Sequence, residues 1–187
     1  MTCSLVVNSK SGNTRMVSGA IKRALQAAGV EFVHAAALSD DADADQVALE
    51  AQGACAADTV LVGFWCDKGA CTPSVAALLS ALHGKRVFLF GTCGFGASEE
   101  YFRQIIDRVT SNLANDAELV GWAMCQGKMG LRSSSATRLC SSKIPITPAL
   151  SCCSTTGSPQ RITPPRKIWT TWLQPPKRPC WGSSSHR

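Results

Sequence analysis

Apolar runs alternate with helix-spaced segments over residues 1–130, and this alternation limits the folds that the chain can adopt. The first unit joins the run CSLVVN at residues 3–8 to apolar side chains spaced by three and four over residues 14–28. Gly29 is placed to end that helix. Runs that are apolar throughout suit strands buried on both faces, and strands that alternate with helices form parallel sheets. The pattern therefore predicts a doubly wound α/β fold.

Later segments repeat this order. The acidic run DDADAD at residues 40–45 is predicted to begin the second helix and to be solvated there, with an acidic surface that attracts basic partners as the alternative. The third helix is predicted to begin near Pro73, and the fourth lies in EEYFRQIIDRVTSNL from residue 99. The later strands are predicted in VEFVHAAAL, TVLVGFWC, KRVFLFGTCGFG and AELVGWAMC, which begin at residues 30, 59, 85 and 117. Right-handed crossovers between five such strands place helices on both faces of one sheet.

Composition divides the chain near residue 130. Residues 1–130 carry 10 Lys and Arg against 13 Asp and Glu, whereas residues 131–187 carry 9 Lys and Arg, no acidic residue and 8 of the 9 prolines. We expect a folded domain over 1–130 and a basic, Ser/Pro/Arg-rich, disordered tail over 131–187. One hypothesis is that the tail is an out-of-frame translation. The alternative is a genuine basic segment whose tryptophans and cations grip nucleic acid or an acidic membrane.

The chain carries no segment that predicts export or membrane insertion. No apolar stretch approaches the roughly 18 residues that a membrane span needs, and no export signal is evident near the first residue. We therefore expect a soluble, cytoplasmic protein without a membrane partner. The 10 cysteines would indicate a disulfide scaffold only in a small secreted chain, so we expect reduced thiols.

Three loops follow the first, third and fourth predicted strands, and each is rich in Gly, Ser, Thr or Cys. They contain SKSGNT at residues 9–14, FWCDKGACT at 64–72 and GTCGFGAS at 91–98. In a doubly wound sheet these loops converge on one crevice beyond the carboxyl ends of the strands. SKSGNT precedes a helix, where open N–H groups and the helix dipole favour an anion such as phosphate. The alternative is a helix cap made by Asn13 or Thr14.

These loops resemble the loops of the flavodoxin family. SKSGNT resembles the flavodoxin phosphate-binding loop, which has the form Ser/Thr-x-Thr/Ser-Gly-x-Thr. DTVLVGFWCDKG resembles the family's third strand and aromatic loop, and VFLFGTCGFGASEEYFRQIIDRV resembles its fourth strand, flavin loop and helix. The resemblance covers roughly residues 2–128. It implies a flavodoxin-like sheet of strand order 2-1-3-4-5, with the last helix missing or replaced because prolines interrupt the segment where it would lie.

The resemblance also implies FMN as the cofactor, with its phosphate on the first loop and its isoalloxazine ring between the other two. The implied cofactor-binding residues are Ser9, Lys10, Ser11, Gly12, Asn13, Thr14, Phe64, Trp65, Cys66, Asp67, Lys68, Gly69, Thr92, Cys93, Gly94, Phe95 and Gly96. Trp65 is the expected stacking partner of the ring, with a core tryptophan as the alternative. Phe95 is a candidate for the other face. Gly69 and Gly94 are candidates for flexible peptides near the ring.

The function implied is electron transfer by an FMN protein between a reductase and an oxidoreductase partner. The alternatives are an FMN-dependent NAD(P)H:quinone-type reductase, or a flavin-free module of the same fold that only binds a partner. No catalytic triad or paired-carboxylate site is legible, and the three histidines fit structural or solvated positions. The cysteines of the crevice loops leave metal or dithiol chemistry as a minor alternative, because CDKGAC has four intervening residues rather than two. Nucleic acid is not the expected partner.

Overall fold

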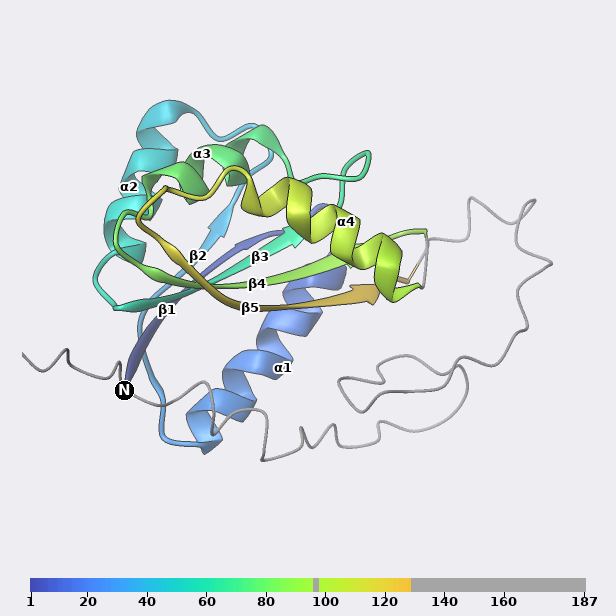
Figure 1. Cartoon of the computed structure of the whole chain (residues 1–187). Helices are drawn as coiled ribbons and strands as arrows, with labels where there is room; N and C mark the ends of the chain where they lie inside the picture. Colours follow the sequence, from blue (N-terminus) through green and yellow to red (C-terminus); the bar gives the residue numbers. More distant parts are fainter. Residues whose placement is uncertain (96–97, 129–187) are drawn as a thin grey trace, which may run out of the picture.

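The computed structural model describes residues 1–95 and 98–128, and it confirms the predicted fold there (Figure 1). Five parallel strands form one sheet of order β2-β1-β3-β4-β5, with helices in the connections. The elements are β1 (Thr2–Asn8), α1 (Asn13–Ala27), β2 (Glu31–Leu38), α2 (Ala44–Ala54), β3 (Thr59–Trp65), α3 (Pro73–Ala81), β4 (Arg86–Cys93), α4 (Glu99–Thr110) and β5 (Glu118–Gln126). The expected loss of the last helix and the predicted tail lie outside the described residues.

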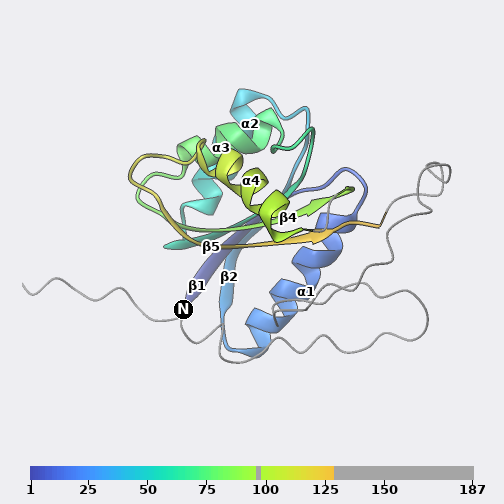
Figure 2. The same cartoon turned by 45° about the vertical axis from the view of Figure 1, so that its right-hand side comes forward.

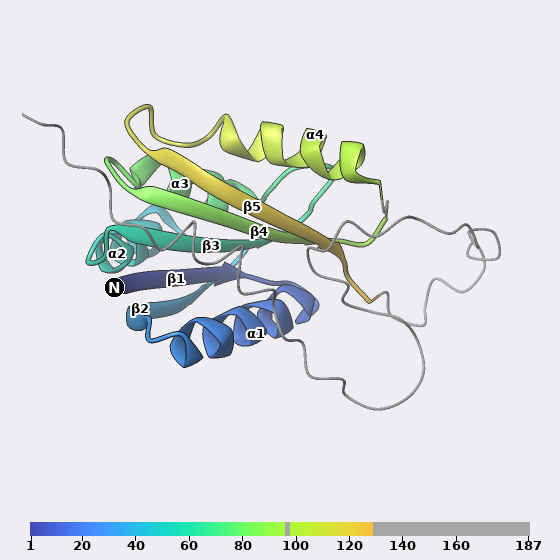
Figure 3. The same ribbon diagram turned by 60° about the horizontal axis from the view of Figure 1, so that its bottom comes forward.

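The helices form two layers around the sheet. Figures 2 and 3 show α1 on one face and α2, α3 and α4 on the other. On the α1 face, Ile21 and Leu25 pack with Leu61 and Phe90 of the central strands. On the opposite face, a larger core joins the three helices to the sheet. Its fully buried members include Phe64, Val75, Leu78, Leu79 and Ile105. The sheet therefore separates two cores and holds their strands at fixed positions.

Burial along the strands follows their place in the sheet. The central strands β1, β3 and β4 are buried almost throughout, as expected from their continuous apolar runs. The expectation of burial on both faces is wrong for β2 and β5. Exposed and partly buried residues alternate along β2, where Val33 is 44% exposed, and β5 is partly buried along most of its length. Both strands lie at the edges, where each has a neighbour on one side only.

Gly29 ends α1, as the sequence predicts. Its φ of 84° lies in the left-handed region, which glycine adopts without a Cβ penalty. Gly29 N donates to Gln26 O at 3.0 Å, and Val30 N donates to Leu25 O at 3.0 Å. These two bonds form a Schellman motif, and the contact of Leu25 with Val30 inside the core completes it. The motif turns the chain from α1 directly into β2.

Two phenylalanines of the central strands each cover a glycine of the neighbouring strand. Gly63 pairs with Phe90 and Phe64 pairs with Gly91 in the β3–β4 register. A Cβ built on Gly63 would meet the Phe90 ring, and one built on Gly91 would meet the Phe64 ring and Met124. The two ring–glycine contacts belong to opposite cores. They lock β3 against β4 just before the loops that follow both strands.

Within the described ranges, no helix is long and apolar enough to cross a membrane.

Candidate functional site

Loops after β1, β3 and β4 lie at the carboxyl end of the sheet, where the parallel topology places them (Figure 1). We name them the first loop (residues 9–12), the second loop (residues 66–72) and the third loop (residues 94–98). Residues 96 and 97 of the third loop, and with them the predicted site residue Gly96, lie outside the described residues. Each loop leads into the N-terminus of a helix, namely α1, α3 and α4.

Hydrogen bonds connect these loops in pairs. Thr14 Oγ1 lies 2.9 Å from Thr92 Oγ1, which links the start of α1 to the end of β4. Cys66 N donates to Thr92 O at 2.8 Å, which links the second loop to β4. Thr72 Oγ1 donates to Asn8 Oδ1 at 3.5 Å, which links the second loop to the end of β1. The structure therefore brings the three sequence-predicted loops together at one edge.

The N-terminus of α1 has no side-chain cap. Its N-cap residue is Gly12, with φ of 85°, so the alternative in which Asn13 or Thr14 caps the helix is wrong. The first three N–H groups of α1 belong to Asn13, Thr14 and Arg15. Among the described residues, one of the three makes a hydrogen bond, which is long, from Arg15 N to Ser9 Oγ at 3.4 Å. No hydrogen bond from the N–H groups of Asn13 and Thr14 is seen within the described ranges, and the partly buried Asn13 N–H lies at the positive end of the helix dipole, where an anion is favoured.

The side chains of the first loop differ in how they are held. Asn13 Nδ2 donates to Ser11 Oγ at 3.0 Å and to Lys128 O at 3.0 Å, which ties the loop to the segment after β5. Thr14 is fully buried, and its hydroxyl is paired with that of Thr92. In such a pair one hydroxyl donates to the other, which leaves one O–H hydrogen for a further acceptor. Ser11 and Lys10 are exposed.

Trp65 is partly buried and is held at its edge by a carboxylate. Its Nε1 donates to Asp40 Oδ1 at 2.8 Å. The same oxygen accepts a hydrogen bond from Asn8 Nδ2 at 2.7 Å. Lys10 of the first loop lies over the indole, with its Nζ 4.9 Å from the ring centroid. The ring predicted to stack on a flavin therefore has a fixed edge and one face turned toward the first loop.

Sequence reasoning missed the contribution of Asp40. The solvated helix start predicted for the acidic run is right for Asp43, whose carboxylate accepts from Gln46 N at 2.8 Å and caps α2. It is wrong for Asp40, which is partly buried and binds two side chains of other strands. The signal in the sequence was Asn8, a polar residue at the end of an apolar run, which needs a hydrogen-bonding partner when it is buried. In the structure Asn8 is only 1% exposed.

A tight turn shapes the second loop. Asp67 N donates to Ala70 O, and Ala70 N donates to Asp67 O, both at 2.9 Å. The two central residues have positive φ, 49° at Lys68 and 85° at Gly69, which is the type I′ pattern. Arg108 of α4 donates from Nη1 to Gly69 O at 3.3 Å. The peptide after Gly69, predicted to be flexible, is therefore bonded at its carbonyl.

The third loop presents an aromatic side chain to solvent. Phe95 is 69% exposed, and its carbonyl accepts a hydrogen bond from Cys93 Sγ at 3.0 Å. Gly94 O accepts from Gln126 Nε2 at 3.3 Å, and a Cβ built on Gly94 would meet nothing within 4 Å. The loop is thus fastened to β5 through its backbone and leaves room beside Gly94.

Burial raises the pKa of three thiols at this edge of the sheet, two in the second loop and one at the end of β4. The pKa rises from an ordinary 9.0 to about 11 for Cys71 and for Cys93, in both cases because burial disfavours the thiolate. Burial also raises the pKa of the Cys66 thiol, and hydrogen bonds from the backbone of Gly69 and Ala70 partly oppose this rise. Over residues 1–95 and 98–128, no three His, Cys, Asp or Glu side chains are grouped to hold a metal ion.

These thiols are expected to react slowly with alkylating reagents. The thiolate is the reactive form, so a pKa of about 11 instead of 9.0 lowers the alkylation rate of Cys71 and Cys93 at pH 8 by about 100-fold. Timed iodoacetamide labelling of native and urea-unfolded chain, followed by peptide mass spectrometry, measures each site separately. The same cysteine in the unfolded chain is the control. Equal rates in the two states would contradict the expectation.

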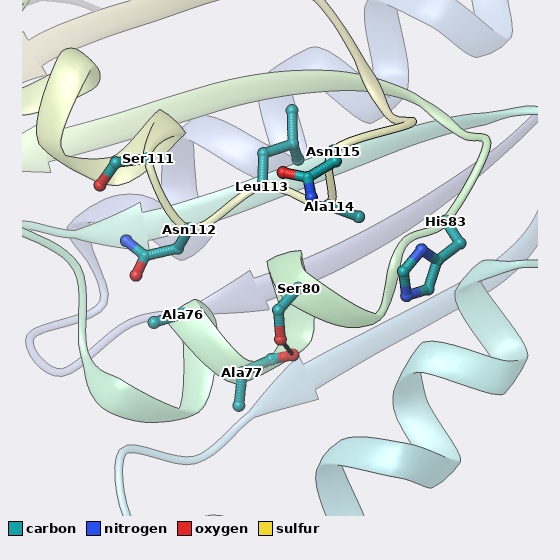
Figure 4. Close-up of a pocket in the computed structure, with 9 residues that line it drawn as sticks. All are labelled: Ala76, Ala77, Ser80, His83, Ser111, Asn112, Leu113, Ala114 and Asn115. Carbon is teal, nitrogen blue, oxygen red and sulfur yellow. Dashed lines mark hydrogen bonds between the residues drawn. The ribbon is translucent and has the colours of Figure 1, made fainter.

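A groove of about 530 Å³ lies at the other end of the sheet, between α3 with the turn after it and the segment that follows α4 (Figure 4). Small and polar side chains line it, among them Ser80, His83, Asn112 and Asn115. His83 Nδ1 lies 2.9 Å from Asp116 Oδ1, and this hydrogen bond lowers the pKa of the Asp116 carboxyl. None of the residues predicted to bind a cofactor lines this groove.

Comparison with known proteins agrees with this geometry. A family model described as the flavodoxin domain matches residues 4–138. The flavodoxin-like domain-containing protein BilS of Clostridioides difficile (strain CD3) is 38% identical over 72 residues, which cover 38% of this chain and 41% of that protein. The protein of the same name from Clostridium symbiosum (strain WAL-14163) is 31% identical over 136 residues, which cover 69% of this chain and 70% of that protein. The chain therefore spans less than half of the first relative.

Solved structures share the fold. A short-chain flavodoxin associated with a bacterial microcompartment has a TM-score of 0.50 and 19% identity, over 68% of this chain and 85% of that one. This likeness supports the arrangement of strands and helices. Together with the match of the domain model over most of the chain, it gives one conclusion. This chain belongs to the flavodoxin family, whose members generally bind a flavin, FMN.

Proposed function

We propose that this chain binds FMN and carries electrons between a reductase and an oxidoreductase partner. The observation that supports the proposal most is the uncapped N-terminus of α1, where the N–H groups of Asn13 and Thr14 are open beside Gly12. An open helix N-terminus suits a phosphate, and Trp65 at the end of β3 lies at the same edge of the sheet. When bound, FMN supplies one- and two-electron transfer.

The residues of the site fit the parts of FMN. The phosphate would take the N–H groups of Asn13 and Thr14, with the Ser9 and Ser11 hydroxyls as further donors. The isoalloxazine ring would take the indole of Trp65, which offers a large face held at a fixed edge. Backbone groups beside Gly94, where a Cβ would meet nothing within 4 Å, leave space for the ring to approach.

Exposed apolar side chains near the loops favour a protein as the redox partner. Phe95 in the third loop is 69% exposed, and Met16 in the first turn of α1 is 65% exposed. A contiguous apolar surface is typical of places where another protein docks. A carrier that must deliver electrons to a second protein needs such a surface beside its cofactor.

Flavin uptake by the full chain is the first test. The purified chain is titrated with FMN and with riboflavin, which lacks the phosphate, and binding is followed by flavin fluorescence and absorbance. We expect FMN to bind about 5- to 30-fold more tightly than riboflavin, because a phosphate at a helix N-terminus contributes roughly 1–2 kcal/mol. A chain that takes up no FMN would contradict the proposal and would favour the flavin-free module.

Reduction kinetics then separate a carrier from a reductase. The FMN-loaded chain is mixed with NADPH alone, or with NADPH and a flavodoxin-type NADPH reductase, and cytochrome c serves as the electron acceptor. A carrier is expected to reduce cytochrome c only when the reductase is present. Rapid oxidation of NADPH by the loaded chain alone, with a quinone as acceptor, would contradict the carrier and support the NAD(P)H:quinone-type reductase.

A further inference from the structure

Asp40 joins the ends of three neighbouring strands through one carboxylate oxygen. It stands two residues after β2, and its Oδ1 accepts from Asn8 Nδ2 of β1 at 2.7 Å and from Trp65 Nε1 of β3 at 2.8 Å. Asn8 is itself fixed. Its Nδ2 also donates to Leu38 O at 3.0 Å, and its Oδ1 accepts from Thr72 Oγ1 at 3.5 Å. The Asp40 carboxylate is therefore held in place by Asn8, independently of its bond to the indole.

Holding the indole by its edge determines where its faces point. A tryptophan side chain has two rotatable bonds, and a hydrogen bond at Nε1 removes much of the freedom of both. A charged acceptor makes that bond stronger than one between neutral groups. With the edge fixed by Asp40, one face of the Trp65 ring lies beneath Lys10 of the first loop. A planar ligand whose phosphate is on the first loop would approach that same face.

We propose that Asp40 is a positioning residue, which holds Trp65 in the orientation needed to stack on the isoalloxazine ring. This inference rests on the proposed binding of FMN and extends it to a residue outside the three loops. Asp40 acts through the indole and needs no contact with the flavin. The same bond disfavours the rotamers of Trp65 in which the ring face would turn away from the first loop.

Removing the acceptor is expected to weaken FMN binding. In the Asp40→Ala chain, Trp65 Nε1 loses its partner and the ring gains rotational freedom, which FMN must remove on binding. Immobilising one such side chain corresponds to a loss in affinity of up to about 10-fold. Asp40→Asn keeps a carbonyl oxygen that can accept from both donors, so its FMN affinity is expected to stay within about 3-fold of the unmodified chain.

A double-mutant cycle isolates the action on Trp65. FMN dissociation constants are measured for the unmodified full chain, Asp40→Ala, Trp65→Phe and the double variant. Phenylalanine has no N–H for the carboxylate to hold, so Asp40→Ala is expected to change the affinity of the Trp65→Phe chain by less than about 2-fold. Asp41→Ala is the matched control, because Asp41 is an exposed neighbour of the same charge that makes neither bond.

Two spectroscopic readouts report on the ring itself. Stacking on an indole quenches flavin fluorescence, so FMN bound to Asp40→Ala is expected to be brighter than FMN bound to the unmodified chain. Without flavin, the fluorescence of Trp65 is obtained as the emission that is lost in Trp65→Phe. Acrylamide is expected to quench this fluorescence more strongly after Asp40→Ala, because the indole is then more accessible. Neither signal is expected to change in the Asp41→Ala control.

The outcomes of these measurements are distinct. Equal losses of FMN affinity from Asp40→Ala in the unmodified chain and in the Trp65→Phe chain would overturn the inference, since Asp40 would then act through the fold. A loss in Asp40→Asn as large as in Asp40→Ala would also overturn it, because charge rather than position would be responsible. If the unmodified chain binds no FMN, the proposed function fails and this inference fails with it. FMN binding with no coupling rejects the inference alone.

Discussion

Replacing Gly63 with valine is expected to lower the free energy of unfolding by about 3 kcal/mol. Gly63 of β3 pairs with Phe90 of β4, and a Cβ built on Gly63 would meet the Cζ and Cε2 atoms of the Phe90 ring. Phe90 is fully buried, so its ring has no free space to move into. Urea denaturation of the full chain, followed by circular dichroism, measures the change.

A second substitution identifies the Phe90 ring as the cause. Phe90→Ala alone is expected to lower the free energy of unfolding by about 3–5 kcal/mol, because it leaves a cavity in the core. The Gly63→Val/Phe90→Ala chain is expected to lose no more than Phe90→Ala alone, because the valine then fills part of that cavity. Additive losses would contradict this, since they would mean that the valine is rejected by something other than the ring.

The same pair of strands places two residues of the candidate site. The register that puts Gly63 beside Phe90 also puts Trp65 beside Thr92 at the ends of β3 and β4. Thr92 in turn lies 2.9 Å from Thr14 through their hydroxyls. A shift of β4 caused by valine at position 63 would therefore move the start of α1 relative to the indole. Stability and the geometry of the site depend on one packing contact.

The order of the elements could be predicted from the sequence because each signal is local. The apolar run at residues 59–65 predicts a buried strand by itself, and the spacing after Pro73 predicts a helix by itself. The end of α1 depends on two bonds, which Gly29 N and Val30 N donate to carbonyl groups three and five residues earlier. All four residues lie close together in the sequence. The three loops followed from the topology, since parallel strands bring their carboxyl ends to one edge.

Contacts that depend on register could not be predicted in the same way. Asn8 pairs with Leu38 in the β1–β2 register, and only this pairing brings Asp40 within reach of Asn8 and Trp65. The sequence places Asp40 in an acidic run, where a solvated carboxylate is the usual interpretation. A shift of one residue in the register would change which carboxylate faces the indole, and nothing in the run distinguishes these cases.

The alternative in which Asn13 or Thr14 caps α1 is wrong because two conformations compete at the start of a helix. Asn13 and Thr14 are good capping residues, but a cap requires an extended backbone at the position before the helix. Here that position is Gly12 in the left-handed region, and both polar residues already belong to the helix. Their side chains bond elsewhere, Asn13 to Lys128 O and Thr14 to Thr92. The backbone N–H groups are left open as a result.

Gly12→Ala is expected to reduce FMN affinity by about 10-fold while leaving riboflavin affinity nearly unchanged. Gly12 has φ of 85°, where an alanine is strained by about 1–2 kcal/mol, although its Cβ would meet nothing within 4 Å. Relief of this strain requires the first loop to change its backbone, which moves the N–H groups of Asn13 and Thr14. A change of 1.4 kcal/mol corresponds to about a factor of ten in binding. Titration with both flavins measures the two affinities.

Gly29 offers a matched control at the other end of the same helix. Its φ is 84°, and a Cβ there would also meet nothing within 4 Å, so Gly29→Ala introduces the same backbone strain as Gly12→Ala. Both variants are expected to lose about 1–2 kcal/mol of unfolding free energy, but only Gly12→Ala is expected to lose FMN affinity. Equal effects of the two variants on FMN would mean that strain in α1, rather than the geometry of the first loop, controls binding. The phosphate would then have to be placed elsewhere than at the N-terminus of α1.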